Sequence, residues 1–183
     1  WASFRSVPPD DWAVRPVSEL ATTFKGKLPT RVLDKPNGRT KPYLLMDGLR
    51  GGTHVYTEET HLPSVTKEDS VLIADGSKSG FAVRGVSGVL GSTLLAFRAR
   101  EETHPSVLFH LLSSLFPFLN SATTGTAIPH LDQDLLLRLR LGIPTSPDEQ
   151  AAIARILDSV DTALERTRAA VERARELRRG LLQ

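Results

Sequence analysis

The C-terminal part of the chain carries the most regular hydrophobic pattern. Hydrophobic side chains recur there in alternating steps of four and three residues, an average spacing of about 3.5 that is typical of a helix packed along a second helix. Neither glycine nor proline interrupts the chain between Pro147 and Gly180. We therefore predict one long coiled-coil helix, with a dimerisation seam formed by Ile153, Leu157, Val160, Leu164, Val171, Ala174 and Leu181.

Both ends of this helix are marked in the sequence. Ser146 can cap the first free amides, Pro147 suits the first helical position, and Glu149 completes a capping box. Gly180 is a favourable stop, so the helix would measure roughly 50 Å at about 1.5 Å per residue. The chain offers no second helix of this length, so we expect the helix to pair with another copy or another protein. The alternative is that it folds back onto its own domain.

The first 145 residues show shorter and more varied patterns. Apolar runs predict strands at 70–74 and 92–99, and alternating leucine and arginine predict a half-exposed strand over 135–144. Pro105, followed by leucines three and four residues apart, predicts a helix that ends before Asn120. Glycine-punctuated loops connect these elements.

The predicted fold therefore belongs to the α+β class. A loop-rich mixed α/β domain occupies residues 1–145, and the long helix occupies residues 146–183. Because loops make up much of a small scaffold, we expect them to carry the function.

Composition excludes several classes of protein. The chain has no cysteine, which excludes a disulfide scaffold, a thiolate nucleophile and a zinc site built on thiolates. No apolar run is long enough for a membrane span and no secretory leader opens the sequence, so we expect a cytoplasmic protein without membrane contact. Since the chain starts at Trp1 rather than methionine, we expect that it was processed or cut from a longer one.

The motifs of common catalytic sites are missing. The sequence lacks the metal-nuclease pattern of an acid with E-x-K and the proline-containing tetrapeptide of amino-methyltransferases. The lysine within Gly76–Gly80 lacks the residue order of a P-loop, and the five histidines lack metal-ligand spacing. We therefore expect no catalytic residue, metal or cofactor in this chain; an undetected enzyme stays the alternative.

Charge is unevenly distributed, although the formal net charge is only +2. Seven basic and two acidic residues lie between positions 25 and 50, whereas residues 51–75 hold five acidic residues and one basic residue. Local positive charge of this kind binds phosphate groups while the molecule stays soluble. The alternative is that the two stretches cancel each other in three dimensions.

Two hydroxyl-rich loops point to the same partner. Gly76–Gly85 places hydroxyls, a lysine and an arginine around glycines, where the backbone can approach a phosphate closely, and Thr123–Leu131 places hydroxyls around Gly125. For either loop alone we favour an ordinary turn, but the two loops together with the basic stretch favour nucleic acid as the partner. The candidate DNA-binding residues are Lys25, Lys27, Arg31, Lys35, Arg39, Ser77, Lys78, Ser79, Arg84, Thr124 and Thr126.

A series of motifs in fixed order resembles a known family. The chain contains Pro9 with Trp12, a turn at Gly26–Pro29, and the segments Lys41–Gly52, Asp69–Gly80 and Thr123–Leu131. The most specific element spans the start of the long helix and comprises Ile143, Pro144, Glu149, Gln150, Ile153, Ala154, Leu157 and Asp158. Over nearly the whole chain, this order resembles the specificity subunit of type I restriction–modification systems.

The resemblance implies a target recognition domain at residues 1–145 and a conserved spacer helix after it. A full subunit of the family carries two such halves, whose helices pack antiparallel and set the distance between two half-sites of a bipartite double-stranded DNA sequence. Modification and restriction subunits supply methyl transfer and cleavage in defence against foreign DNA. This chain would be a half-subunit that pairs with itself or a sister half, or a fragment. The alternative is a coiled-coil protein–protein adaptor without DNA recognition.

Overall fold

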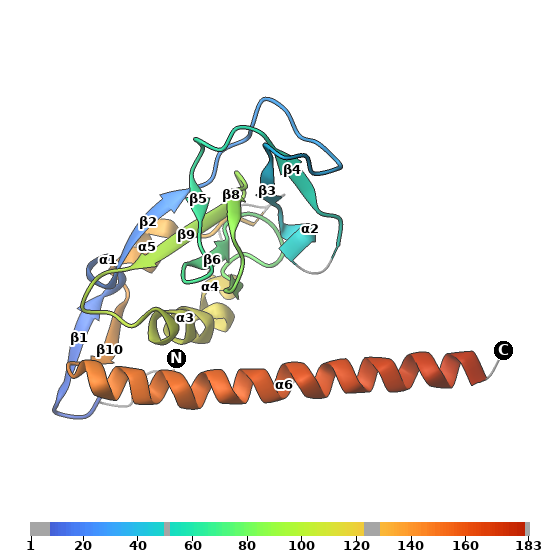
Figure 1. The fold of residues 1–183 in the computed structure, drawn as a ribbon. Helices are drawn as coiled ribbons and strands as arrows, with labels where there is room; N and C mark the ends of the chain where they lie inside the picture. Colours follow the sequence, from blue (N-terminus) through green and yellow to red (C-terminus); the bar gives the residue numbers. More distant parts are fainter. Residues whose placement is uncertain (1–7, 50–51, 123–128, 182–183) are drawn as a thin grey trace.

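A four-stranded antiparallel sheet forms the centre of the N-terminal domain, which we call the head (Figure 1). The computed structural model describes residues 8–49, 52–122 and 129–181, and the head is the described part up to Thr145. The strand order of the central sheet is β2–β9–β6–β7. Its strands are β2 (Ala21–Lys25), β9 (Leu94–Ala99), β6 (Ser70–Ile73) and β7 (Ala82–Val83).

Two further sheets are formed by the described residues of the head. A mixed sheet has the order β4–β3–β8–β5, in which only β3 and β8 run parallel. Its strands are β4 (Val55–Thr57), β3 (Lys41–Leu44), β8 (Gly88–Leu90) and β5 (Ser64–Val65). A two-stranded antiparallel sheet pairs β1 (Trp12–Pro16) with β10 (Arg140–Pro144), and so joins the two ends of the head.

Strands β6 and β9 are buried on both faces, which explains their continuous apolar runs. Successive side chains of a strand point to opposite faces. Leu72 and Phe97 accordingly belong to a cluster beneath the helices, whereas Val71 and Ala96 belong to a second cluster that includes residues of the mixed sheet. The predictions of strands at 70–74 and 92–99 are therefore confirmed, with β9 beginning at Leu94.

In the part of the head that the structure describes, five short helices accompany the sheets. They are α1 (Val17–Leu20), α2 (Met46–Leu49), α3 (Pro105–Ser114), α4 (Phe116–Ser121) and α5 (Gln133–Arg138). The helix predicted from Pro105 is confirmed, but it is divided at Leu115 into α3 and α4. Pro117 lies in the first turn of α4, where its missing N–H and fixed φ are tolerated, although they would disrupt the middle of a longer helix.

The strand predicted over 135–144 is wrong in its first half. Residues Gln133–Arg138 form α5, and only Arg140–Pro144 form the strand β10. The carboxylate of Asp132 accepts a hydrogen bond from the Leu135 amide at 2.8 Å and so caps the helix. Burial of Leu136 in the core then stabilises the helix relative to the strand that the alternating pattern predicted.

The long C-terminal helix, α6 (Pro147–Leu181), is confirmed, and we call it the stalk. Its first turns pack beneath α3, with Ala154 buried, whereas every residue from Thr162 to Leu181 is exposed (Figure 1). Gly180 lies within the helix instead of ending it, because one glycine weakens a helix without breaking it. Within the described residues, neither this helix nor another is long and apolar enough to span a bilayer.

An ion pair between the buried carboxylate of Asp69 and the half-exposed Arg98 of β9 links the turn before β6 to the central sheet. Asp69 is 2% exposed, and its carboxylate accepts hydrogen bonds from Arg98 at 2.9 and 2.8 Å and from the Thr66 amide at 2.8 Å. Burial alone would raise the pKa of Asp69, but the hydrogen bonds from Arg98 and Thr66 outweigh it and lower the pKa below its ordinary value.

We expect the substitution Asp69→Asn to lower the free energy of unfolding at neutral pH by roughly 1–3 kcal/mol. Since folding lowers the pKa of Asp69, its stabilisation is present above the unfolded pKa and is lost as pH falls through the folded one. The difference in the free energy of unfolding between wild type and variant, measured by urea titration, should therefore shrink below about pH 4. Exposed Glu68→Gln is the control; equal unfolding curves for Asp69→Asn and wild type would contradict this role.

Candidate nucleic-acid interface

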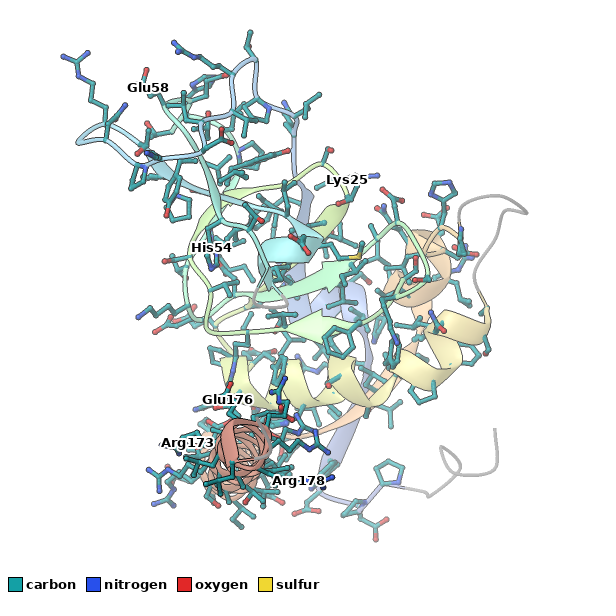
Figure 2. The ribbon with its side chains drawn as sticks, turned by 90° about the vertical axis from the view of Figure 1, so that its right-hand side faces the viewer. Lys25, His54, Glu58, Arg173, Glu176 and Arg178 are labelled. Atoms are coloured by element: carbon teal, nitrogen blue, oxygen red, sulfur yellow. The ribbon has the colours of Figure 1, made fainter. Side chains whose placement is uncertain are left out.

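The predicted basic residues between positions 25 and 39 lie at the end of the head far from the stalk. Lys25 ends β2, and Lys27, Arg31, Lys35 and Arg39 follow in the long connection to β3, all of them exposed. Figure 2 shows Lys25 and Glu58 on the upper part of the head, with Arg173 and Arg178 of the stalk at the opposite end. The cations are therefore gathered in one region instead of being scattered over the fold.

The acidic stretch lies directly against this connection and holds its backbone in place. The Glu59 carboxylate accepts hydrogen bonds from the Arg31 amide at 3.0 Å and the Thr30 hydroxyl at 3.3 Å. Glu58 accepts one from the Asn37 side chain at 2.9 Å. Two backbone hydrogen bonds of 2.8 Å pair Leu33 with Tyr56 of β4. The connection is thus mounted on the mixed sheet.

The alternative for this region was that the acidic stretch 51–75 cancels the charge of the basic stretch 25–50, and it applies only in part. The two glutamates reduce the local net charge, but they bind amide and hydroxyl groups instead of cationic side chains. Among the described residues, Lys27, Arg31, Lys35 and Arg39 form no ion pair with a carboxylate. Four positive side chains therefore remain exposed to solvent on a fixed backbone.

Hydrogen bonds inside the loop Gly76–Gly80 hold its backbone, and they bury Ser79, one of the predicted DNA contacts. Ser79 is fully buried, and its hydroxyl lies 2.7 Å from the Gly76 carbonyl and 3.1 Å from that of Pro129. Gly80 has a positive φ of 89°, and a Cβ there would meet Leu119 at 2.7 Å. Ser79 therefore stabilises the turn from inside, because a buried hydroxyl needs hydrogen-bond partners that the loop backbone supplies.

The same turn leaves Ser77 and Lys78 at its exposed tip. Asn120 of α4 donates hydrogen bonds to the carbonyl groups of Ser77 at 3.1 Å and Ser79 at 3.2 Å. The backbone of this tip is consequently fixed from the side of α4, while the Lys78 side chain is free of carboxylate partners within the described part of the chain. Ser77 and Lys78 keep their candidate role.

Asp75 and His130 join the basic region to this loop, and the sequence did not single them out. His130 Nδ1 lies 2.7 Å from one Asp75 carboxylate oxygen, and Lys25 Nζ lies 3.8 Å from the other. The charge of Lys25 is therefore partly balanced, unlike that of the cations after it. His130 lies in the hydroxyl-rich segment Thr123–Leu131, but no spacing in the sequence indicated its partner 55 positions away.

The prediction for Arg84 is also corrected by the structure. Its guanidinium group donates to the Asp158 carboxylate of the stalk at 2.7 Å, also hydrogen-bonds to Ser106, and lies 4.9 Å from the centre of the Phe109 ring. Arg84 thus binds the stalk to the head instead of facing solvent with the basic connection. Thr124 and Thr126, the last two candidates, lie outside the described residues.

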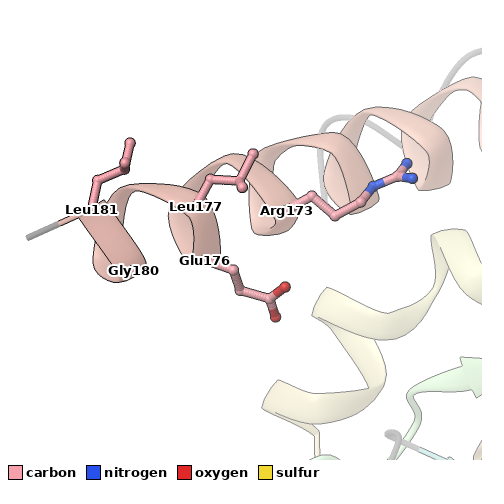
Figure 3. A pocket seen from close by; sticks show the side chains of 5 residues that line it. All are labelled: Arg173, Glu176, Leu177, Gly180 and Leu181. Atoms are coloured by element: carbon pink, nitrogen blue, oxygen red, sulfur yellow. The ribbon is translucent and has the colours of Figure 1, made fainter. Parts of the chain in front are cut away.

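The predicted seam of the stalk is divided by its contact with the head. Ile153 packs against the main core of the head and is removed from the seam, and Leu157 is half-buried. Val160, Leu164 and Val171 are between 43% and 50% exposed, Ala174 is exposed, and Leu181 is 85% exposed. Near the tip, Leu177, Gly180 and Leu181 line a shallow hollow with Arg173 and Glu176 (Figure 3).

Comparison with known proteins places this architecture in a family. The type I restriction modification DNA specificity domain family matches residues 9–173. The Type I restriction enzyme MjaVIII specificity subunit of Methanocaldococcus jannaschii is 28% identical over 178 residues, which cover 96% of this chain and 42% of that protein. The chain therefore spans less than half the length of this curated relative.

Solved structures share the fold. The S subunit of a type I restriction-modification system from M. genitalium superposes with a TM-score of 0.68 at 21% identity, over 92% of this chain and 44% of that one. The HsdS subunit from Thermoanaerobacter tengcongensis gives a TM-score of 0.67 at 18% identity, over 93% and 41%. A chain from a structure of a type I R-M system gives a TM-score of 0.72 at 20% identity, over 92% of this chain and 43% of that one.

Among the described residues, no group of three or more histidine, aspartate or glutamate side chains is arranged to hold a metal ion. The family match covers most of the chain, including the head with its exposed basic connection and the greater part of the stalk. The chain belongs to the family of type I restriction–modification DNA specificity domains.

Proposed function

We propose that this chain recognises one half of a bipartite double-stranded DNA sequence as the specificity component of a type I restriction–modification system. The observation that carries the proposal is the set of four exposed cations without carboxylate partners in the described structure, mounted on a fixed backbone at the far end of the head. Phosphate contacts from such side chains position a protein on duplex DNA, and base contacts in the grooves add sequence specificity.

The proposed DNA contacts are a revised form of the predicted set. They retain the exposed basic connection and the tip of the Gly76–Gly80 turn, and they omit the buried Ser79 and the stalk-bound Arg84. The contact residues are Lys25, Lys27, Arg31, Lys35, Arg39, Ser77 and Lys78. A preformed surface favours binding, because little conformational freedom is lost when DNA arrives.

Catalysis belongs, in this proposal, to partner chains. Modification and restriction subunits supply methyl transfer and cleavage, and this chain supplies the DNA sequence at which they act. Its relatives are described as specificity subunits of such systems, which supports this division. The stalk pairs antiparallel with a second copy or a sister half through its exposed residues, and this pairing places two heads at a set distance.

Salt dependence tests the basic connection. We expect Lys35→Ala and Arg39→Ala each to weaken binding to all duplex sequences alike, and each to reduce the slope of log affinity against log salt by about 0.9. Binding is measured to duplexes selected from a random pool by the chain together with its modification subunit. The matched controls, Lys67→Ala and Arg168→Ala, replace exposed cations outside the proposed surface and should leave the slope unchanged. A flat salt response of the wild-type chain would contradict the assignment.

Stalk pairing is tested by a charge in the exposed seam. Leu164 lies beyond the part of the stalk that packs on the head, so Leu164→Glu should release monomers without unfolding the head. Analytical ultracentrifugation measures the mass and circular dichroism checks the fold. Arg166→Glu, two residues further along and so on the opposite face of the helix, is the control and should keep the mass of the wild type. An unchanged mass for Leu164→Glu would exclude this seam.

A further inference from the structure

The first turn of the stalk is fixed to the head by side chains from the family motif. Glu149 accepts a hydrogen bond from the Trp12 indole at 3.0 Å. Gln150 is 3% exposed; its carbonyl oxygen accepts from the His104 amide at 2.7 Å, and its Nε2 donates to the backbone carbonyls of Glu102 at 3.0 Å and Pro144 at 2.9 Å. These bonds fix where the stalk leaves the head.

A second polar attachment lies about two turns further along the stalk. The Asp158 carboxylate accepts from Arg84 at 2.7 Å and from the Ser106 hydroxyl at 2.9 Å, and one of its oxygens lies 3.0 Å from His110 Nε2. Burial alone would raise the pKa of Asp158, but the hydrogen bonds from Arg84, His110 and Ser106 lower it below its ordinary value. The carboxylate is therefore charged at neutral pH.

Because the two attachments lie at different points along the stalk, together they fix both where the stalk leaves the head and the direction in which it extends. The distance along the helix from Glu149 to Asp158 is about 13 Å, and the exposed part from Thr162 to Leu181 extends about 30 Å further, at about 1.5 Å per residue. A tilt of about 10° at the outer attachment would move the tip by roughly 5 Å, which exceeds the rise of one base pair, about 3.4 Å.

We propose that Asp158, with Arg84, Ser106 and His110, is a positioning cluster that sets the angle between stalk and head, and so sets the spacing of half-sites that two paired heads accept. This inference rests on the proposed function for its DNA consequence. The cluster need not contribute much to stability, because the Asp158 side chain is 38% exposed and partly exposed ion pairs contribute little. A small change of angle at the cluster nevertheless produces a large displacement of the stalk tip, because the exposed part of the stalk is long.

The angle is measured first without DNA. Because the chain contains no cysteine, Glu68→Cys on the head and Arg178→Cys near the stalk tip introduce two unique sites for spin labels, both exposed. Double electron–electron resonance, with labelled chains diluted in unlabelled protein, reports the distance within one chain. We expect one narrow distance distribution for the parent chain, and a shift or broadening of about 5 Å when Asp158→Ala is added.

The matched control is Glu165→Ala, which removes a carboxylate from the exposed part of the stalk and should leave the distance distribution unchanged. Asp158→Asn, of nearly the same shape, provides a second variant if the alanine chain does not fold, and an intermediate broadening is expected for it. Identical distributions for the folded Asp158 variants and the parent chain would overturn the proposal, whatever their behaviour on DNA.

Spacing preference is the second readout. On duplexes carrying both selected half-sites, wild type should discriminate against spacers changed by one base pair, and Asp158→Ala should lose this discrimination. Affinity for a duplex with a single half-site should stay unchanged, a pattern that general destabilisation of the head would not produce. Equal spacing preferences in wild type and variant would also refute the inference. If wild type selects no sequence at all, the proposed function fails, and the label distances still decide whether Asp158 fixes the angle.

Discussion

The buried amide of Gln150 is the interaction that fixes the point at which the stalk leaves the head. A buried polar group without partners is costly, so Gln150 is stable only where the backbone of several segments meets it. Those segments are the turn before α3 and the end of β10, and the three hydrogen bonds bring both to the first turn of α6. Since β10 pairs with β1, the same residue links both ends of the head to the stalk.

The head separates its functions in space. Hydrophobic burial on both faces of β6 and β9 forms the centre of the head, and the basic connection between β2 and β3 lies at the end away from the stalk (Figure 1). Glu59 holds the basic connection by its backbone, and Ser79 holds the Gly76–Gly80 turn in the same way. From the sequence, Ser79 was a candidate DNA contact and Glu59 a charge that could cancel the basic stretch. Both side chains bind backbone atoms instead, so the neighbouring cations stay exposed for a ligand.

Several elements were predictable because their signals are local. The heptad spacing and the Ser146–Pro147 start identified the long helix, and uninterrupted apolar runs identified β6 and β9. The strand predicted over 135–144 failed in its first half because alternating leucine and arginine satisfy a strand in isolation, whereas the cap from Asp132 and the burial of Leu136 decide for a helix. The alternating pattern runs through both halves of this segment, so the cap and the burial of Leu136 decide where the helix ends and β10 begins.

The sequence by itself determined the start and helical character of the stalk, the basic character of one connection and the resemblance to a family. Tertiary structure alone decided which polar residues face solvent. Arg84 and Asp158 lie 74 positions apart and Asp75 and His130 lie 55 apart, so no spacing could indicate that the members of each pair meet. Hydrogen bonds and ion pairs are formed at distances of a few ångströms, and only folding of the whole chain brings such groups together.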